Sequence, residues 1–320
     1  TVFLFVIFIS GLIGLFAVFK IYNLPEIIPL TFYYSCILFS VLTATFFLIG
    51  LKGLTDELKE KLSVLIVTIG IMLYGFEIYL ITQVDQRTKM EVLDDLIDSG
   101  INAYPNVNPD YLVKNASTKN GFISKGGEIF PLGGISNQMM VQKNENGYWM
   151  MYVGDRYGFH NENYVYNQNI IDIVMTGDSF TEGWSVKSEE NIGAVLQKFG
   201  FKVVNIGKAG NGSLIELAAI KEYAEQLKPK IVLWIYFIND LIDLSYEIKS
   251  LILNKYLNDD GFSQNLISRQ NEIDSVLINH VQFEWNKERE RKRENESWIN
   301  NWVIRILKLW NLRVRINLIP

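Results

Sequence analysis

The sequence is poor in the side chains that most often bind metal ions or form covalent cross-links. It has one cysteine, Cys36, and two histidines, His160 and His280, among 320 residues. A single cysteine cannot form an intrachain disulfide, and no Cys or His pattern has zinc-site spacing. The glycines in residues 207–212 do not fit the Gly-x-Gly-x-x-Gly dinucleotide fingerprint. We therefore expect no metal ion and no bound cofactor.

The sequence also lacks a strong excess of charge of one sign. Its formal net charge is -5, and the one dense charge run, residues 287–296, interleaves five basic with four acidic residues. Mixed signs at this spacing allow i,i+4 pairing along a solvated helix, whereas a nucleic-acid surface needs an excess of positive charge. Nucleic acid is therefore not an expected partner.

Long hydrophobic runs, in contrast, are abundant at the N-terminal end. Residues 2–20, 27–51 and 62–82 are almost uninterrupted apolar stretches. Each approaches or exceeds the roughly 18–20 residues that a helix needs to cross a bilayer. Three such runs are too many for the core of a soluble protein. The sequence therefore predicts that residues 1–83 form three transmembrane helices in a lipid bilayer.

The charged residues around these runs indicate how the protein is oriented in the membrane, and one charged residue lies inside a run. The link between the second and third runs contains Lys52, Lys59 and Lys61, which by the positive-inside rule favours a cytoplasmic link and an extracytoplasmic C-terminal part. Basic residues soon after the third run, at 87 and 89, argue for the opposite orientation. Glu77 lies within the third run, where an ionisable group suggests function. Its place near the end of the run favours the simpler interpretation that it reaches the interface.

Residues 84–169 differ from the segments on either side. Residues 84–98 have helical spacing and predict a juxtamembrane helix. The following residues, to 169, contain turn signals between short aromatic or β-branched runs, of which 148–153 is the clearest strand. We interpret 84–169 as a juxtamembrane helix with a β-rich lead-in, which serves either as a spacer or in binding substrate.

The most informative local pattern is a strand that ends in a Gly-Asp-Ser turn at residues 177–179. Apolar side chains up to Met175 favour a buried strand of a parallel sheet. Gly177 permits a tight turn, and Asp178 can support it. A serine on such a strand-to-helix turn exposes its hydroxyl, which makes Ser179 a candidate nucleophile. An ordinary turn of an α/β protein is the alternative.

Two later segments repeat this arrangement. Residues 203–205 form a short β-branched strand that precedes a glycine-rich loop containing Gly210 and a helix-compatible run at 214–227. Residues 231–237 form another apolar strand, and it leads to Asn239. Strands that alternate with helices predict a parallel α/β sheet, in which functional residues gather at the carboxyl ends of the strands.

These three segments together resemble the SGNH (GDSL-type) hydrolase superfamily. The resemblance is carried by Gly-Asp-Ser-Phe at 177–180, Asn-Ile-Gly-Lys-Ala-Gly at 205–210 and Phe-Ile-Asn-Asp at 237–240. It implies a flavodoxin-like, three-layer α/β/α domain with a parallel sheet over residues 170–320. It also implies that Ser179 is the nucleophile, and that the Gly210 N–H and the Asn239 amide form the oxyanion hole. Phe237 stands where the family often has glycine.

The family's Asp-x-x-His, which supplies the general base, is missing from the sequence. His280 lies in a helical stretch and is expected to be a surface residue. His160 is a secondary candidate, because a related branch of polysaccharide acetylating enzymes places an Asp-x-His before the serine, but here Asp155 is five residues away. The chain starts without methionine and ends at Pro320, directly after an amphipathic stretch. We therefore expect the catalytic Asp and His to lie beyond Pro320.

A weaker resemblance, to the N-terminal extension of SGNH proteins of bacterial surface-polysaccharide loci, is carried by Gly-Ile-Ser-Asn at 134–137, Asn-Glu-Asn-Gly-Tyr at 144–148 and Asp-Arg-Tyr-Gly-Phe at 155–159. It implies a serine ester hydrolase or O-acyltransferase, anchored in the bacterial cytoplasmic membrane by several spans, with its catalytic domain outside the cytoplasm. The expected substrate is an acylated, for example acetylated, cell-surface glycan. Two alternatives are a lipid or thioester esterase and a non-catalytic SGNH-fold binding module of polysaccharide assembly. The acyl group and the oligomeric state stay open.

Overall fold

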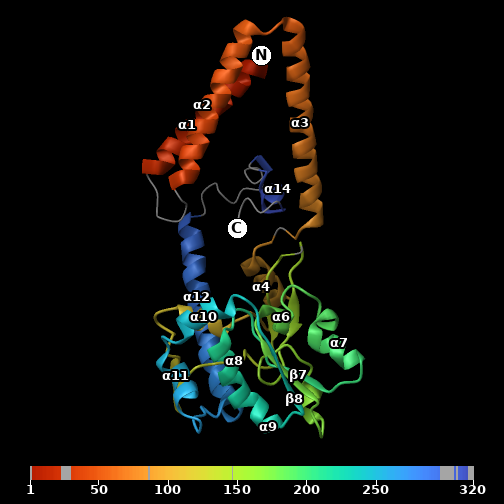
Figure 1. Ribbon diagram of the computed structural model, residues 1–320, viewed down its shortest axis with the longest axis vertical. Coiled ribbons are helices and arrows are strands. Elements are labelled where there is room, and N and C mark those ends of the chain that lie inside the picture. Colours follow the sequence, from red (N-terminus) through yellow and green to blue (C-terminus); the bar gives the residue numbers. More distant parts are fainter. Residues whose placement is uncertain are drawn as a thin grey trace. The chain divides into compact units, whose positions relative to one another are not determined.

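The computed structural model describes residues 2–22, 30–85, 87–145, 147–295, 306–307 and 309–315 (Figure 1). The chain divides into two compact units. One unit comprises residues 1–80 together with 301–320, and the other comprises residues 81–300. Most of the amphipathic stretch before Pro320 lies outside the described residues.

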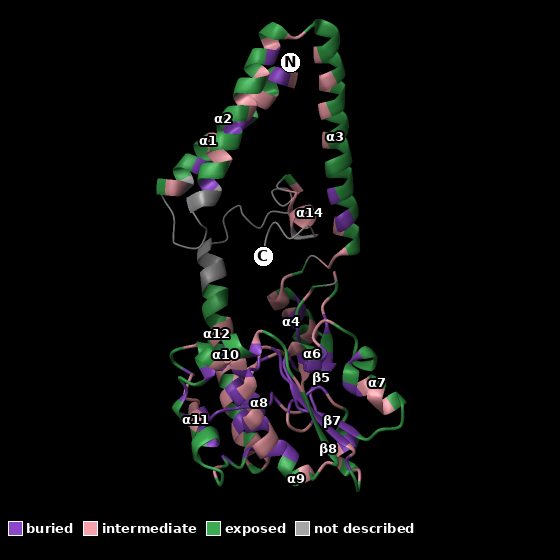
Figure 2. Ribbon diagram, viewed as in Figure 1, coloured by how far each residue is buried: buried purple, intermediate pink, exposed green. Residues whose placement is uncertain are grey.

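The first unit contains the predicted hydrophobic helices. These are α1 (Val2–Tyr22), α2 (Leu30–Gly53) and α3 (Asp56–Gln83), and each is long and apolar enough to cross a membrane. Most of their apolar side chains are exposed, as lipid contact requires (Figure 2). Helix α3 begins six residues earlier than the predicted span, because acidic residues in its first turn favour the positive end of the helix dipole. The prediction of a membrane protein is confirmed by these helices.

Glu77 of α3 is fully buried, and its carboxylate has defined partners within the same unit. Its Oε1 accepts hydrogen bonds from the backbone N and the side-chain Nδ2 of Asn311, at 2.8 and 2.9 Å. Its Oε2 accepts from the backbone N of Leu312 at 2.8 Å. These donors belong to the first turn of α14 (Trp310–Arg315). The carboxylate is therefore matched to the N–H groups that a helix leaves unpaired at its start.

The second unit is built on a parallel sheet, as the sequence predicts. Its strands are β6 (Ile173–Gly177), β7 (Val203–Asn205) and β8 (Ile231–Ile235), in the order β7-β6-β8. Both pairings of β6 are parallel. The broad α/β class is confirmed by this topology.

Helices pack on the two faces of β6 and β7 in this sheet (Figure 1). Val174 and Val204 face the main core together with α8 (Ser213–Ala219), whereas Met175 belongs to a smaller cluster joined by Leu196 of α7 (Ile192–Lys198). Helix α8 continues through a π-helical segment, Ile220–Ala224, into α9 (Glu225–Leu227). The helical run predicted at 214–227 thus forms, with one irregular turn.

Strand β8 lies at an edge of this sheet among the described strands. Its first four residues, 231–234, expose 54%, 43%, 37% and 44% of their surface. Apolar strands of a parallel sheet are usually buried on both faces. In the described residues, β8 is instead paired on one side and uncovered on its faces.

The lead-in packs into the same core as the parallel sheet. It contains α4 (Lys89–Asp98), α5 (Pro109–Lys114), a hairpin of β2 (Phe122–Ser124) and β3 (Gly127–Ile129), and a sheet of β1 (Ala103–Pro105), β4 (Met139–Val141) and β5 (Met151–Val153). Its Phe130 and Tyr152 share one hydrophobic cluster with Val174. Helix α4 starts later than predicted because Thr88 and Glu91 form a capping box there. The lead-in is therefore an integral part of the second unit.

Helices follow β6 and β8 directly, and two more helices come later in the chain. Helix α6 (Ser179–Glu182) follows β6, and α10 (Asp240–Glu247) follows β8. Helix α10 does not continue into the next helix, because the Ser250 side chain caps a separate helix, α11 (Leu251–Asn258). The long α12 (Gln270–Asn295) completes the described part of the unit.

A close approach of two backbone segments near Gly158 gives a test of this packing. Gly158 has φ +76°, and an added Cβ would overlap the backbone of Gly134. Gly100 has a similar φ of +82° but open space around it. We expect Gly158→Ala to lower the free energy of unfolding by about 3 kcal/mol and Gly100→Ala by about 1 kcal/mol. Denaturant unfolding of the full chain in detergent measures both, and equal losses would show that the Gly134 contact is unimportant.

Candidate functional site

Ser179 lies where the sequence places it, on the turn between β6 and α6. The Asp178 carboxylate accepts a hydrogen bond from the Phe180 backbone N at 3.0 Å and so caps α6. Gly177 has φ +154°, and a Cβ there would overlap Thr181 and lie 2.7 Å from the Ile235 carbonyl oxygen, so the turn requires glycine. Ser179 is partly exposed, and no described residue hydrogen-bonds to its hydroxyl.

Asn239 lies next to this turn, one short segment after β8. Its Nδ2 donates to Asp243 Oδ2 at 2.9 Å, and its amide lies close enough to the Asp178 carboxyl to lower the pKa of that group. Burial raises the pKa of Asp178, and the hydrogen bonds from Phe180 and Asn239 partly offset this rise. The rings of Phe180 and Phe237, whose centroids are 4.8 Å apart, pack the two segments together. The Asn239 amide is thus beside the Ser179 turn, with the Asp243 carboxylate as its present acceptor.

Gly210 follows β7 on a loop that is tied to the same turn. The Lys208 backbone N donates to the Gly177 carbonyl oxygen at 3.2 Å. Gly210 has φ +77°, and a Cβ there would lie 2.6 Å from Asp110 Oδ2. The structure therefore brings the Gly210 loop, Asn239 and Ser179 to the carboxyl ends of adjacent strands.

A lead-in ion pair borders these residues, and the sequence did not indicate it. Lys114 of α5 pairs with Asp110 and, at 2.9 Å, with Asp243 Oδ1. Burial raises the pKa of Asp110, while Lys114 counteracts the rise. Because Asp243 also accepts from Asn239, the lead-in is connected through this network to both Gly210 and Asn239. More than a hundred residues separate α5 from Asp243, so no local motif could reveal the contact.

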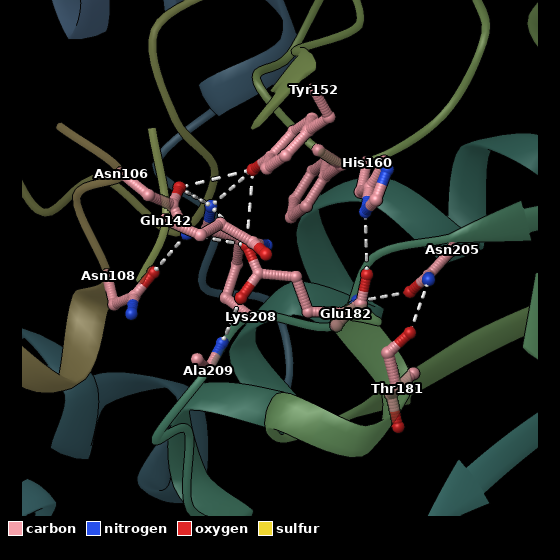
Figure 3. Close-up of polar contacts among 12 residues, drawn as sticks. Asn106, Asn108, Gln142, Tyr152, His160, Thr181, Glu182, Asn205, Lys208 and Ala209 are labelled. Atoms are coloured by element: carbon pink, nitrogen blue, oxygen red, sulfur yellow. Dashed lines mark hydrogen bonds and ion pairs between the residues drawn. The ribbon is translucent and has the colours of Figure 1, made fainter. Parts of the chain in front are cut away.

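A fully buried ion pair between Glu182 and Lys208 lies near the site (Figure 3). Both side chains are 0% exposed, and Lys208 Nζ lies 3.0 Å from Glu182 Oε1. Lys208 Nζ also donates to Asn106 Oδ1 at 2.7 Å and to the Tyr152 hydroxyl at 3.1 Å. Glu182 Oε2 accepts from the Ala209 backbone N at 2.8 Å. Every charge in this cluster therefore has a partner.

This ion pair joins two of the predicted motifs. Glu182 lies one helical turn after Ser179, and Lys208 lies two residues before Gly210. Burial alone would raise the pKa of Glu182, but the Lys208 cation and the hydrogen bonds around it bring the pKa below its usual value. The carboxylate is therefore charged, and it holds the serine turn against the glycine loop.

His160 is buried and does not contact Ser179. Its Nδ1 lies 2.9 Å from the Glu182 carbonyl oxygen, and its Nε2 lies 2.8 Å from Ser188 Oγ. Its ring stacks on Tyr152 with 4.0 Å between centroids. Both nitrogens are thus occupied by groups other than the predicted nucleophile.

His280 differs from the surface residue that the sequence suggested. It does lie on α12, but its ring is half-buried against Phe122, with 5.4 Å between ring centroids, and near Tyr111. Its Nε2 is buried and has no hydrogen-bond partner among the described residues. Burial lowers its pKa. The lead-in covers this face of α12, which helical periodicity alone could not show.

A cavity of about 500 Å³ lies between the lead-in and α12, and neither Ser179, Gly210 nor Asn239 is among the residues that line it. One wall includes Trp184, whose backbone N donates to the Ser179 carbonyl oxygen at 2.9 Å. The lead-in contributes Asn106 and Asn108, and α12 contributes Trp285. The volume is within the range of small-molecule sites. Among the described residues, no group of three or more acidic, His or Cys side chains could hold a metal ion.

Comparison of the chain with protein-family models, with curated proteins and with solved structures finds no match. The site must therefore be interpreted from its own chemistry.

The buried ion pair predicts a large effect of removing one partner. Lys208→Met leaves the Glu182 carboxylate buried without its cation, and we expect a loss of about 3–5 kcal/mol in the free energy of unfolding. Lys143 pairs with Glu145 at the surface, and Lys143→Met should change this free energy by less than about 1 kcal/mol. Urea unfolding of the full chain in detergent tests both variants. A small effect of Lys208→Met would mean that the Glu182 cluster does not stabilise the fold.

Two carboxyl groups near the start of α8 predict how stability depends on pH. Burial raises the pKa of Glu216 to about 8 and that of Glu247 to about 7. Because the folded state binds these two protons more tightly than the unfolded state, protonation of the two carboxyl groups stabilises the fold. This contribution to the free energy of unfolding is complete below pH 4.5 and is lost as the pH rises to about 8. We expect a higher Tm at pH 5 than at pH 8, and Glu216→Gln should reduce the difference. The exposed Glu225→Gln serves as control, and a Glu216→Gln profile identical to wild type would contradict the assignment.

Proposed function

We propose that the protein is a membrane-anchored serine ester hydrolase or O-acyltransferase of the SGNH type. The observation that supports it most is the convergence of Ser179, the Gly210 loop and Asn239 at the carboxyl ends of three adjacent parallel strands. A nucleophile beside an amide donor and a glycine-rich loop is the arrangement that acyl transfer needs.

In this proposal the Ser179 hydroxyl oxygen adds to the carbonyl carbon of an ester while its proton passes to a general base. The Ser179 and Gly210 N–H groups and the Asn239 amide stabilise the oxyanion. The tetrahedral adduct expels the alcohol, which takes up a proton, and leaves an acyl-enzyme. Attack by water completes hydrolysis, whereas attack by a sugar hydroxyl completes transfer. For this to occur, Asn239 must exchange its present acceptor, the Asp243 carboxylate, for the oxyanion.

The substrate and the location are part of the same proposal. An acylated surface glycan fits a site whose neighbouring cavity is lined by indole rings and amides, because aromatic faces stack on sugar rings while amides bind hydroxyls. The lysine-rich link between α2 and α3 supports an extracytoplasmic second unit in a bacterial cytoplasmic membrane.

A second candidate, a binding module with an SGNH-type fold and no catalysis, is favoured by one observation. No described histidine hydrogen-bonds to the Ser179 hydroxyl, and the Asn239 amide already donates to Asp243. A serine alcohol without a base is a weak nucleophile. The two candidates differ in the reactivity of Ser179.

Covalent labelling separates them. We expect a fluorophosphonate to modify Ser179 of the full chain in detergent, because such probes react with activated serines. Trypsin should release this serine in the peptide 157–187, where fragment spectra assign the modified residue. Ser179→Ala should abolish that adduct.

Ser245→Ala is the matched control, because Ser245 is an exposed serine on the neighbouring α10. It should label at the wild-type rate. Absence of a Ser179 adduct in the folded wild-type chain would favour the binding module.

A further inference from the structure

A second serine in the same unit has what Ser179 lacks, a histidine in hydrogen-bonding contact. Ser188 is exposed and begins the short η2 (Ser188–Glu190), and its Oγ lies 2.8 Å from His160 Nε2. This distance is the contact that a nucleophile and its general base require. The pair lies 28 residues apart in sequence.

The surroundings of His160 fix the direction of this hydrogen bond. Its Nδ1 faces the Glu182 carbonyl oxygen at 2.9 Å, and a carbonyl oxygen only accepts, so Nδ1 carries the proton. Nε2 then accepts, and the Ser188 hydroxyl donates to it. Burial lowers the pKa of His160 despite the opposing charge of Glu182, so the ring is neutral at pH 7. Stacking on Tyr152 holds the ring plane.

Glu182 is anchored in turn by the buried ion pair with Lys208, so the carbonyl group that orients His160 is itself fixed. The set of nucleophile, base and orienting group is therefore complete in the folded chain. Positioned groups of this kind need no rearrangement before reaction.

Ser188 and His160 line a cavity of about 300 Å³. Asn191 lines it too, and its Oδ1 accepts from the Ala194 backbone N at 2.8 Å, which sets the orientation of the amide. No described residue accepts from its Nδ2, so this donor is available for an oxyanion. The lining also contains Glu162 and Glu189 but no lysine or arginine. A cavity with this charge attracts a cation.

We propose that Ser188 and His160 form a second nucleophilic site, distinct from Ser179, that takes small esters carrying a cationic group. The Ser188 oxygen bonds to the ester carbonyl carbon, and its proton moves to His160 Nε2. The C–O bond to the alcohol then breaks, and the alcohol leaves with that proton. Water attacks the acyl-serine in the same way, with His160 again receiving and returning a proton, and releases the acid. The reaction consumes one ester and one water, with no redox change.

The test compares two fluorophosphonates of equal size on the full chain in detergent, one ending in trimethylammonium and one in its neutral tert-butyl analogue. Trypsin cuts after Lys187, so Ser188 falls in the peptide 188–198 and Ser179 in 157–187. An adduct that blocks this cut gives the joined peptide 157–198, and its fragment spectra show which serine is modified. The two sites are therefore scored separately.

We expect an adduct at Ser188 in the wild type and in Ser179→Ala, and none in Ser188→Ala. His160→Gln keeps polar groups near both partners but is not a base, so labelling should slow by about 100-fold or more. The cationic probe should react faster than the neutral one, and Glu189→Gln should narrow the difference. Ser245→Ala should behave as wild type.

The proposal is overturned if folded wild-type protein shows no Ser188 adduct with either probe. It is also overturned if His160→Gln, folded by circular dichroism, labels at the wild-type rate. If that variant does not fold, the rate of Ser188 labelling is compared between folded wild-type protein and wild-type protein unfolded in urea. Equal rates overturn the proposal, because a serine without an assisting base would react equally in both states. Labelling confined to Ser179 would refute this site and leave the function proposed for Ser179 intact.

Discussion

The arrangement of the second unit depends on one buried charge pair. Removing Glu182 and Lys208 from water is costly, and only mutual contact with full hydrogen bonding offsets that cost. Because the two residues belong to different βα connections, this requirement permits only one relative placement of the serine turn and the glycine loop. The same Glu182 uses its carbonyl group to orient His160. One residue thus specifies the geometry of two serine environments.

The lead-in supplies the remaining partners of that pair. Asn106 and the Tyr152 hydroxyl contact Lys208, and Asp110 with Lys114 borders Gly210 from the outside. A parallel sheet alone would leave these polar groups facing water or each other. The β-rich segment therefore supplies hydrogen-bond and ion-pair partners to the polar groups at the carboxyl edge of the sheet. The hydrophobic cluster that it shares with β6 holds the segment in this position.

The sequence predicts features whose signals are local. The three spans, the parallel strands and the turn at Ser179 follow from runs of apolar residues and from Gly177, which the turn requires. Asp110 and Lys208 could not be identified, because their roles arise from contacts with distant segments and an isolated charged residue suggests a surface position. His160 could be flagged as a rare residue type, but its partner Ser188 depends on how the chain folds back.

Strand β8, which no described residue covers on its outer edge, has a practical consequence for handling the protein. Strand edges with free N–H and C=O groups and apolar side chains are templates on which further strands assemble. A preparation of residues 81–300 freed from the membrane spans would therefore carry a built-in tendency to form oligomers and aggregates through Ile231–Ile235. Lysine in place of outward-facing valine or leucine on this strand is the substitution that natural edge strands use against such growth. Colloidal behaviour, rather than stability of the fold, then becomes the property that limits biochemical work.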